Sequence, residues 1–466
     1  MMGLTSTIVR AILSAAIISP VLAINENEFA PNDIIIRDVC ILGGGATGTY
    51  AAVSLKDKAK SVVVVERHEI LGGHTETLYT DNDQYIDYGV EGLFDNELSR
   101  NYFNRLGVDY KLLLPNTLVN QYVDFKTGKK VSPPAGLLDT AAAAVLYRKA
   151  IQKYSYLQDG LYNLPDPVPD ELLRPFSEFV EETGIQSALQ FIFMFSHNLG
   201  NVLETPLLYV LQSIGIPHID ALLEGGYITP KAGMYQLYEK ASEVLGSDVI
   251  YQSTVNETER SDSGVKIVVQ GANGARKLIK ANQLLVTFVP YKDNLQGFDL
   301  ATTESSAFGK WDWKGYYVAV VNNTGIPNAV TVLNTDPSNN TPGNLPLPPF
   351  QWALQYLGAN GYLASKIVGD KSLTEGQARE LVLSDIRRMG TAGTYPGGDP
   401  EIVAFGSHVP ETLTVSNAEI RDGFYKKLYA LQGTKNTFYT GFAFCSDHSA
   451  LLWAYTETVV QKMISS

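Results

Sequence analysis

The sequence is poor in cysteine and in positive charge. Only two cysteines occur among 466 residues, so no disulfide framework is expected, and a chain of this length buries a sizeable core without one. The formal net charge is −13, and no stretch is strongly basic. Because nucleic acids and anionic membranes are bound by basic surfaces, we expect neither as a partner.

Long hydrophobic runs are also missing after the first residues. No later stretch reaches the roughly 18 apolar residues that a membrane-spanning helix needs. At the amino terminus, Arg10 precedes a short apolar run, Ala11 to Val21, and small or modest residues lead up to Ala23. This pattern is typical of a secretory signal peptide. We expect cleavage after Ala23 and a secreted protein without a membrane anchor.

The secretory route bears on two further features. Asn256, Asn322 and Asn339 each begin an Asn-x-Thr sequon, so they are candidate glycosylation sites. Cys40 and Cys445 could pair in an oxidising compartment. Cys40, however, lies in an apolar segment, which favours a small buried side chain over a disulfide.

Common metal and hydrolase motifs are absent as well. The six histidines show no His-x-x-x-His spacing, and there is no Cys-x-x-Cys pair or Gly-x-Ser-x-Gly elbow. We therefore expect no metal, and the sequence leaves the catalytic residue unassigned. A second glycine fingerprint in mid-chain, typical of flavin reductases that use pyridine nucleotides, is also missing.

Glycine is abundant, and one glycine-rich loop lies between a predicted strand and a predicted helix. The apolar run Ile34 to Leu42 predicts a strand that ends at Gly43-Gly44-Gly45-Ala46-Thr47-Gly48. A segment with helical spacing, Ala46 to Lys58, follows, and then the valine-rich run Ser61 to Val65 predicts a strand buried on both faces. Strand, loop, helix and strand form a βαβ unit. Glu66 ends it, 18 residues after Gly48.

Each position of this unit suits a dinucleotide. Gly43 permits a tight turn, Gly45 lets the backbone approach a pyrophosphate, and Gly48 lets helix and strand pack closely. The start of the helix offers unpaired N–H groups to phosphate. Glu66 is placed to accept hydrogen bonds from ribose hydroxyls. The candidate residues of this region are Gly43, Gly45, Ala46, Thr47, Gly48, Glu66 and Arg67.

The residues after Glu66 separate FAD from NAD. Glu66 to Thr75 contains the glycine pair Gly72-Gly73, which a nicotinamide fold does not need. From the glycine loop through Gly73, the chain resembles the extended dinucleotide motif of the flavin-containing amine oxidoreductase superfamily. The resemblance implies bound FAD, with Gly72, Gly73, His74 and Thr75 near its diphosphate and ribityl groups.

Further matches follow in the order of that family. Tyr85 to Gly89 resembles its Asp-x-Gly segment, and Gly225 to Leu237 resembles the element that re-enters the cofactor domain. Val255 lies where a family residue contacts the adenine side through its backbone. Gly441, with Phe442 after it, resembles the terminal element under the isoalloxazine ring.

The resemblance implies an α/β fold in which a discontinuous Rossmann-like FAD-binding domain carries an inserted α+β substrate domain, as in amine oxidases. The intervening segments, helical from Leu118 and richer in strands and loops from Asp299, supply the substrate domain. The expected division is a signal peptide over 1–23, FAD-binding parts over 31–117, 225–298 and 405–466, and substrate-domain parts over 118–224 and 299–404.

Departures from the family pattern bear on the reaction. His68 and His74 stand where arginines are usual, and Phe442-Ala443 replaces a Thr-Glu pair. Leu451 aligns with a tyrosine of the aromatic cage of monoamine oxidases. These differences argue against an ordinary monoamine oxidase.

The carboxyl-terminal pattern is more specific. Phe438 to Phe444, with Ser449, Trp453 and the segment Gly73 to Thr77, resembles the secreted fungal flavoproteins related to β-cyclopiazonate dehydrogenase. That resemblance implies removal of hydride from an indole-bearing substrate, with ring closure.

Four side chains leave alternatives open. His74 either hydrogen-bonds phosphate in place of arginine, which we favour, or forms an 8α-histidyl bond to the flavin; yellow colour retained on acid-precipitated protein would show the bond. Cys445 is a rival attachment point whose offset from the family position is wrong. Lys310 and Lys314 lie roughly where amine oxidases hold a water at flavin N5, although surface lysines are the default.

The sequence thus predicts a secreted FAD-dependent oxidoreductase. We expect hydride transfer from a small-molecule substrate C–H, next to nitrogen or an indole-type ring, to flavin N5. Oxygen is the candidate electron acceptor. The alternatives are an L-amino-acid or polyamine oxidase and a flavin-binding accessory protein without turnover.

Overall fold

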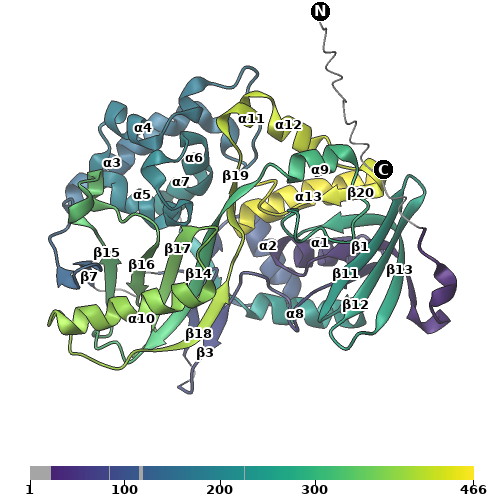
Figure 1. The fold of residues 1–466 in the computed structure, drawn as a ribbon, viewed down its shortest axis with the longest axis horizontal. Coiled ribbons are helices and arrows are strands. Elements are labelled where there is room, and N and C mark those ends of the chain that lie inside the picture. The colour runs from purple at the N-terminus through teal and green to yellow at the C-terminus, as the bar shows by residue number, and fades with distance from the viewer. Residues whose placement is uncertain (1–22, 83, 115–118, 225, 466) are drawn as a thin grey trace, which may run out of the picture.

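The computed structural model describes residues 23–82, 84–114, 119–224 and 226–465. The predicted signal segment up to residue 22, Leu118 and Gly225 lie outside the described residues. The described chain forms two lobes that lie side by side (Figure 1). One lobe is built on a mixed sheet next to the glycine loop, and the other combines a second sheet with a group of helices.

The first sheet has seven strands in the described residues, in the order β10-β2-β1-β13-β12-β11, with β20 also paired to β13. Its strands are β1 (Ile34–Leu42), β2 (Val62–Val65), β10 (Val249–Ile250), β11 (Ser253–Ser261), β12 (Gly264–Gly271), β13 (Arg276–Val286) and β20 (Thr437–Tyr439). The strands β10, β2, β1, β13 and β20 run parallel, whereas β11 and β12 are antiparallel additions. The sequence predicts this βαβ unit. It also predicts strands over Val249 to Val255, Val265 to Gln270, Gln283 to Val289 and Thr437 to Gly441, and strands lie in all four places, although β13 begins at Arg276, before the expected Gln283.

The valine run shows why this sheet forms. All four residues of β2 are buried, as expected for a parallel strand covered on both faces. In the described residues, five helices lie in the same lobe as this sheet: α1 (Ala46–Asp57), α2 (Glu97–Leu106), α8 (Gln236–Leu245), α9 (Thr302–Phe308) and α13 (Ser449–Ser465). The terminal helix α13 packs along α1, and the indole N–H of Trp453 donates to the carbonyl of Ala46 at 3.1 Å. The end of the chain therefore covers the start of the glycine-loop helix.

Two small sheets join this lobe to its neighbour. They contain β3 (Thr77–Tyr79) with β4 (Tyr85–Asp87), and β5 (Leu93–Phe94), β9 (Tyr227–Pro230) and β6 (Tyr110–Leu112). The Asp87 carboxylate accepts hydrogen bonds from the Met234 N–H at 2.9 Å and the Thr77 hydroxyl at 2.5 Å. This contact links the predicted Asp-x-Gly segment to the segment that re-enters the cofactor domain.

The second sheet has eight strands in the described residues. They are β7 (Val119–Asp124), β8 (Lys129–Lys130), β14 (Asp312–Asn322), β15 (Val330–Asn334), β16 (Phe350–Gln355), β17 (Leu363–Asp370), β18 (Glu401–Ser407) and β19 (Glu411–Thr414). Helix α10 (Glu375–Thr391) packs on one face (Figure 1), and Thr374 caps its first turn together with Gln377. Helices cover the other side.

The sequence predicts long amphipathic helices here, such as Leu137 to Tyr156 and Asp170 to Phe195, and the observed helices are shorter. They are α3 (Leu137–Ala150), α4 (Phe176–Thr183), α5 (Leu189–Ser196), α6 (Leu207–Ser213) and α7 (Ile216–Glu224), with α11 (Asn417–Arg421) and α12 (Phe424–Tyr429) beside them. The stretch expected as one helix from Asp170 to Phe195 breaks at Pro175 and again at Gly184, which takes a left-handed conformation with φ +69°.

Strand pairing moves one expected boundary. The third FAD-binding part was expected to begin at residue 405, but β18 and β19 both pair with β14 of the second sheet. Residues through Thr414 therefore belong structurally with the substrate lobe. Long-range pairing decides this, and local sequence carries no sign of it.

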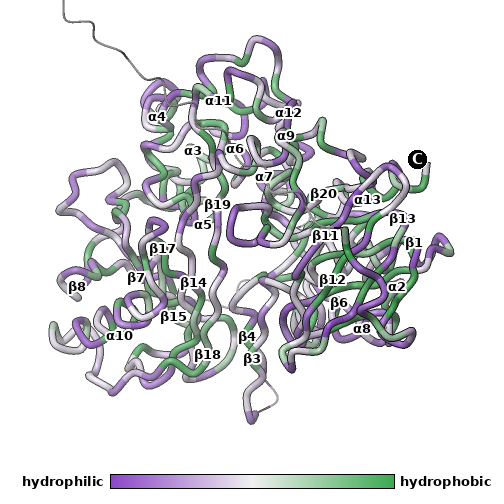
Figure 2. Tube along the Cα trace, turned by 45° about the vertical axis from the view of Figure 1, so that its right-hand side comes forward, coloured by the Kyte–Doolittle hydropathy of each residue, from purple (hydrophilic) through white to green (hydrophobic). Residues whose placement is uncertain are grey.

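Both cysteines lie in the core of the protein. Cys40 in β1 and Cys445 after β20 are both free and fully buried, so the expectation of a buried thiol rather than a disulfide is confirmed. Figure 2 shows hydrophobic residues gathered along the strands β1 and β13 and inside the helical group. Among the described residues, no helix has the length and apolarity that crossing a membrane requires.

Candidate flavin and substrate site

The glycine loop leaves no room for side chains at two positions. A Cβ on Gly43, whose φ is +103°, would lie 2.6 Å from the Thr287 hydroxyl. A Cβ on Gly48 would lie 1.9 Å from the carbonyl oxygen of Gly43. Helix α1 therefore packs directly on the turn at the end of β1, as the sequence motif requires.

The start of α1 is open for an anion. Gly45 is its N-cap residue and supplies no side-chain hydrogen bond. Ala46 and Thr47 form the first turn, so their N–H groups point out of the helix end with the positive end of its dipole. This arrangement fits a pyrophosphate.

Glu66 is held in place by backbone donors. The Gly44 N–H donates to one carboxylate oxygen at 2.6 Å, and the His68 N–H donates to the other at 2.8 Å. A carboxylate has about four lone-pair positions, so acceptor capacity remains for ribose hydroxyls. Arg67 is exposed, and its Nε donates to the His68 ring at 3.0 Å.

The second glycine pair lies against the first loop. Gly72 and Gly73 have φ of +123° and +57°, which side chains rarely adopt. A Cβ on Gly73 would lie 3.0 Å from the Cα of Gly45, so the two backbones nearly touch. Thr75 follows as a buried residue. The structure thus brings the two glycine motifs together into one cradle.

Two distant segments complete the cradle. Gly441 has φ +104°, and its Cβ would lie 2.9 Å from the Thr287 carbonyl and 4.0 Å from the Thr47 hydroxyl. The half-buried Val255 follows Ser253, whose N–H donates to the Glu66 carbonyl at 2.9 Å. The predicted cofactor residues therefore converge from three separate stretches, and the cradle fits a dinucleotide.

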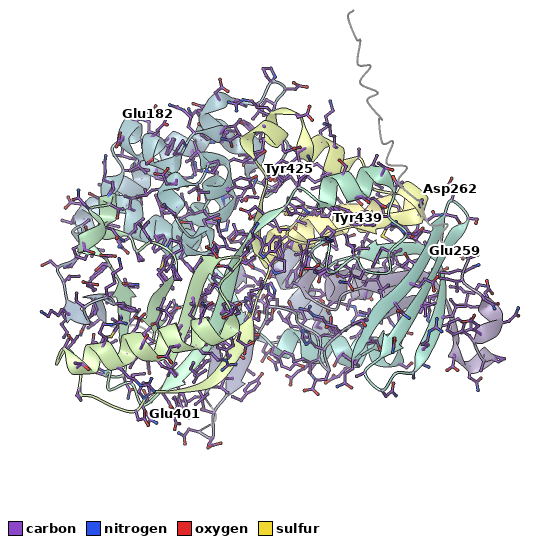
Figure 3. All side chains as sticks on the ribbon, viewed as in Figure 1. Glu182, Glu259, Asp262, Glu401, Tyr425 and Tyr439 are labelled. Atoms are coloured by element: carbon purple, nitrogen blue, oxygen red, sulfur yellow. The ribbon has the colours of Figure 1, made fainter. Side chains whose placement is uncertain are left out.

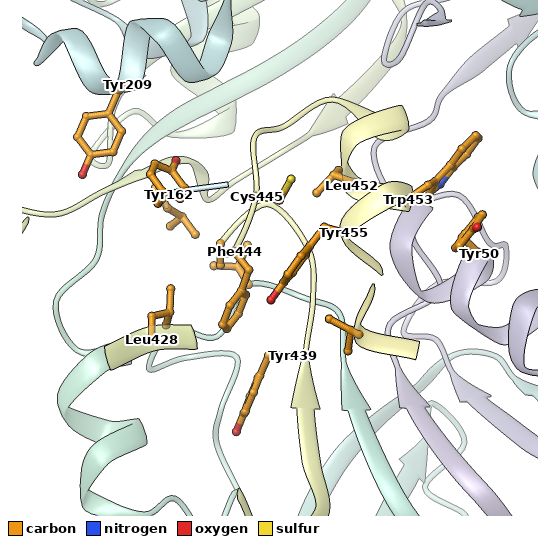
Figure 4. Packing of buried hydrophobic residues seen from close by; sticks show 14 of the residues in the cluster. Tyr50, Tyr162, Tyr209, Leu428, Tyr439, Phe444, Cys445, Leu452, Trp453 and Tyr455 are labelled. Carbon is orange, nitrogen blue, oxygen red and sulfur yellow. The ribbon is translucent and has the colours of Figure 1, made fainter. Parts of the chain in front are cut away.

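A cavity lies beside Gly441, between the loop after β20, the helical group and β19. Its lining is aromatic on several sides and polar at one end: Tyr162, Phe195, Tyr209 and Phe442, with Asn198, Gln212, Glu411 and Asp447. Figure 4 shows Tyr162 and Tyr209 together with Cys445, which belongs to the same lining. The ring of Tyr162 stacks on that of Tyr425 at 3.8 Å, which stiffens this wall. Tyr425 is also labelled in Figure 3.

The polar end of the cavity has an excess of acceptors. Asn198 donates its amide N–H to Glu411 Oε1 at 3.3 Å, and Gln212 donates to the Leu161 carbonyl at 3.2 Å. These bonds orient both amides. Among the described residues, no donor reaches Asn198 Oδ1, Gln212 Oε1 or Glu411 Oε2, although all three atoms are buried. Buried acceptors without donors are costly, so they point to a ligand that supplies donors.

His74 turns toward the substrate lobe. Its ring stacks on that of His408, with centroids 4.1 Å apart, and Nδ1 lies 3.9 Å from Glu411 Oε2. Burial and the neighbouring His408 lower the pKa of His74 to about 3. A neutral imidazole is compatible with a hydrogen bond to phosphate and with a covalent bond to the flavin, so the two alternatives both stay open.

Two further polar contacts lie near this stack. His408 Nε2 lies 3.3 Å from Glu76 Oε2, and burial raises the pKa of Glu76 to about 7. His197 Nε2 lies 3.1 Å from the Tyr316 hydroxyl, and burial lowers the pKa of His197 to about 3. Tyr316 neighbours both histidines, because its ring centroid lies 5.7 Å from that of His408 and 5.9 Å from that of His197.

Other residues singled out in the sequence lie elsewhere. Lys310 forms an ion pair with Glu419 at 2.7 Å on the surface, in agreement with the default expectation of a surface lysine. Lys314 is half-buried on β14 and is the strand partner of Glu411. Leu451 lies on α13 and packs near Gly160. It is not among the residues that line the cavity. Within the described ranges, no group of three or more His, Cys, Asp or Glu side chains is placed to hold a metal ion.

A discontinuous dinucleotide cradle beside an aromatic, polar-ended cavity defines a two-lobed flavin-dependent oxidoreductase. The comparisons with known proteins agree with this class. The chain belongs to the flavin-containing amine oxidoreductases, because the model of that family matches residues 46–398. The predicted family, fold class and cofactor, FAD, are thereby confirmed.

Two relatives are similar to this chain over nearly its whole length. It is 42% identical to the β-cyclopiazonate dehydrogenase of Aspergillus oryzae over 440 residues, which are 94% of this chain and 96% of the relative. It is 34% identical to the FAD-dependent oxidoreductase pigF of Monascus ruber over 469 residues, or 99% and 98% of the two chains. Such similarity makes the protein a FAD-dependent oxidoreductase of the kind found among fungal enzymes.

Solved structures agree on the fold. The CLA-producing fatty acid isomerase from P. acnes superposes with a TM-score of 0.74 at 19% identity, covering 91% of this chain and 98% of the other. A putrescine oxidase variant superposes with a TM-score of 0.67 at 14% identity, covering 93% and 99%. At these identities, the likeness concerns the fold alone.

The polar end of the cavity was not found in the sequence. Asn198, Gln212, Glu411 and Asp447 belong to no motif and are scattered over about half the chain. The aromatic lining was anticipated only as a general richness in tyrosine and phenylalanine. A weak signal existed for Glu411, because a carboxylate three residues after His408 and directly after Val409-Pro410 is unusual for a solvated loop.

Proposed function

We propose that the enzyme dehydrogenates a planar aromatic small molecule that carries an N–H group, and that oxygen takes up the electrons. The cradle would hold FAD, and bound FAD would supply a hydride acceptor for a substrate C–H next to nitrogen or an indole-type ring. The product loses two hydrogens without release of ammonia. A secondary metabolite is the substrate class in keeping with the relatives' names.

The three unsatisfied acceptors at the polar end of the cavity carry this proposal. A substrate N–H would donate to Glu411, Asn198 or Gln212, and its ring would lie between aromatic side chains such as Phe442. Aliphatic amino acids and polyamines lack a flat ring to fill such walls.

Culture extracts test the proposal. Purified holoprotein is mixed anaerobically with extract fractions, and bleaching of the visible flavin band reports substrate oxidation. Air is then admitted, and peroxide and the product mass are measured. Bleaching followed by peroxide and a product two hydrogens lighter supports dehydrogenation by oxygen. Ammonia released from amino acids or polyamines would favour an amine oxidase instead, and no bleaching by any fraction would favour an accessory protein.

We also propose that the protein is secreted and that Ile24 is its first residue after processing. Two observations support this. Ile24 is buried with Val268 and Leu278, and its backbone nitrogen donates to the Glu259 carboxylate at 2.8 Å. After cleavage at Ala23, this nitrogen would be an ammonium group, which strengthens the bond to Glu259.

Secretion has two direct tests. The amino terminus of protein from culture medium is expected to be Ile24, and Glu259→Gln is expected to lower the thermal midpoint of the processed protein. Equal thermal midpoints of the processed wild type and of Glu259→Gln would contradict the ammonium contact. Asn256 is exposed on β11, so it is the sequon most open to a glycan. Asn256→Gln is expected to remove a mass shift that an N-glycosidase also removes.

A further inference from the structure

A histidine of the substrate lobe lies flat against a histidine of the flavin cradle. The ring of His408 stacks on that of His74, with centroids 4.1 Å apart and planes 2° from parallel. His74 directly follows Gly73 of the cradle, and its ring centroid lies 6.0 Å from that of Phe442, the residue after Gly441. One face of the His74 ring is therefore covered by a side chain from the other lobe.

His408 is fixed independently of this stack. Its backbone N–H donates to the Tyr316 carbonyl at 3.0 Å, and its Nε2 shares a hydrogen bond with Glu76 Oε2 at 3.3 Å. His408 lies between β18 and β19 of the second sheet, whereas Glu76 directly precedes β3 and is two residues after His74. The bond thus ties the short segment that carries His74 to the substrate lobe.

Two glycines make room for these contacts. A Cβ on Gly406 would lie 2.2 Å from both carboxylate oxygens of Glu76, and Gly406 does not have a positive φ. The neighbouring carboxylate therefore explains why glycine stands there, and backbone conformation does not. A Cβ on Gly89 would lie 2.1 Å from the His74 carbonyl oxygen, so the backbone of His74 is also tightly packed.

Both rings of the stack are uncharged at ordinary pH. Burial lowers the pKa of His74 and of His408 to about 3. Two cationic rings at this separation would repel each other, so the neutral state allows the stack. The edge of the His74 ring also has a neighbour, since its Nδ1 lies 3.9 Å from Glu411 Oε2. His408 and Glu411 lie only three residues apart, so one turn of the substrate lobe meets both the face and the edge of this ring.

We propose that His408 and Glu76 are positioning residues that hold the His74 ring in one orientation toward bound FAD. The inference goes beyond the dehydrogenation proposed above, and its tests need no substrate, so the two are decided independently. It applies to both roles open to His74, because a hydrogen bond and a covalent bond each require the ring nitrogen to be aimed at one place.

Positioning matters here because His74 is only partly enclosed. Its side chain is 33% exposed, so the protein leaves part of the ring open on the cradle side of the stack. A side chain that binds a cofactor acts best when packing and hydrogen bonds lock its rotamer beforehand. The His408 ring supplies the packing, and Glu76 holds that ring in place through its hydrogen bond.

FAD binding by alanine variants tests this role. Acid precipitation first shows whether the wild-type flavin is covalently held. If FAD is released, titration of apoprotein with FAD gives the dissociation constant, and His74→Ala and His408→Ala should each weaken binding about 3- to 10-fold, the usual worth of one hydrogen bond. If the flavin stays on the protein, the fraction of protein that carries it is measured. His74→Ala should then abolish that fraction, and His408→Ala should lower it.

The double variant separates positioning from ordinary structural support. If His408 acts through His74, adding His408→Ala to His74→Ala should change the FAD affinity by less than about twofold, because the ring to be positioned is already gone. An equal effect of His408→Ala in both backgrounds would overturn the proposal. Wild-type FAD binding by His74→Ala would overturn it too, since no ring would then need positioning.

Variants of Glu76 and Gly406 give a second readout. Glu76→Gln keeps an acceptor oxygen in a side chain of the same shape, so FAD binding should stay within about twofold of the wild type, whereas Glu76→Ala should match His408→Ala. Equal losses in Glu76→Gln and Glu76→Ala would contradict the role of the hydrogen bond. Gly406→Ala covers the case in which His408→Ala does not fold, and it should weaken binding because its Cβ displaces the Glu76 carboxylate. Glu401→Ala is the matched control, exposed on the same strand as Gly406, and it should bind FAD as the wild type does.

Discussion

Replacing Gly48 by alanine tests the cofactor cradle at its tightest contact. The added Cβ would lie 1.9 Å from the Gly43 carbonyl oxygen and 2.8 Å from the Thr287 hydroxyl. Ordinary contact begins near 3.4 Å, so α1 and the turn must separate by about 1.5 Å. The displaced parts are the open helix end and the loop beneath it, which together hold the pyrophosphate.

The expected size of the effect follows from packing. Overpacking a tight site costs about 1–3 kcal/mol. At about 1.4 kcal/mol for each tenfold change in an equilibrium constant, the affinity for FAD should fall about 5- to 150-fold. Titration of apoprotein with FAD, followed by flavin fluorescence, measures the dissociation constant. The thermal midpoint of the apoprotein shows how much of the cost falls on folding itself.

Gly376→Ala is the matched control. Gly376 lies in the first turn of α10, and a Cβ there meets nothing within 4 Å. Alanine at this position should leave FAD binding unchanged and stabilise the helix slightly. The reasoning is refuted if Gly48→Ala binds FAD within twofold of the wild type, or if Gly376→Ala weakens binding as much.

Two further predictions concern buried ionisable side chains. Arg260 and Glu304 are fully buried and bonded to each other at 2.8 Å. Arg260→Met should therefore cost about 3–5 kcal/mol of unfolding free energy in urea titrations, with part recovered when Glu304→Gln is added; a cost below about 1 kcal/mol would contradict it. His197 has a folded pKa of about 3, because burial disfavours its cation. The unfolded chain takes up a proton below pH 6.5 that the fold does not, so wild-type stability falls as pH drops from 6.5 toward 3. His197→Gln lacks this loss, and its stability relative to wild type should rise by up to about 1.4 kcal/mol per pH unit over that range. Parallel pH profiles of unfolding would disprove this assignment.

Local patterns determined the parts of the fold that bind the cofactor. The strand Ile34–Leu42 agrees residue for residue with its prediction, and α1, β2, β20 and α13 agree within one or two residues. These elements are marked by strong signals, namely a glycine loop, a run of valines and a terminal apolar helix. Their geometry depends on neighbours in the sequence, so it is visible there.

The substrate lobe was less predictable. Helix α10 lies in a region expected to hold strands and loops, although its capping residues Thr374 and Gln377 were present in the sequence. The boundary at residue 405 was misplaced, because β18 and β19 join a sheet whose other strands lie far away in the chain. Pairing between distant strands depends on packing of both faces, which composition does not reveal.

The sequence by itself determined that this chain binds FAD and belongs to the amine oxidoreductase class. Phosphate and ribose are held by one short βαβ unit whose glycines and acidic residue are neighbours. Only the tertiary structure decided what faces the substrate. Asn198, Gln212, Glu411 and Asp447 come from separate segments, and each is an ordinary polar residue in the sequence. Their place in the site arises from burial, which leaves three acceptors without donors among the described residues.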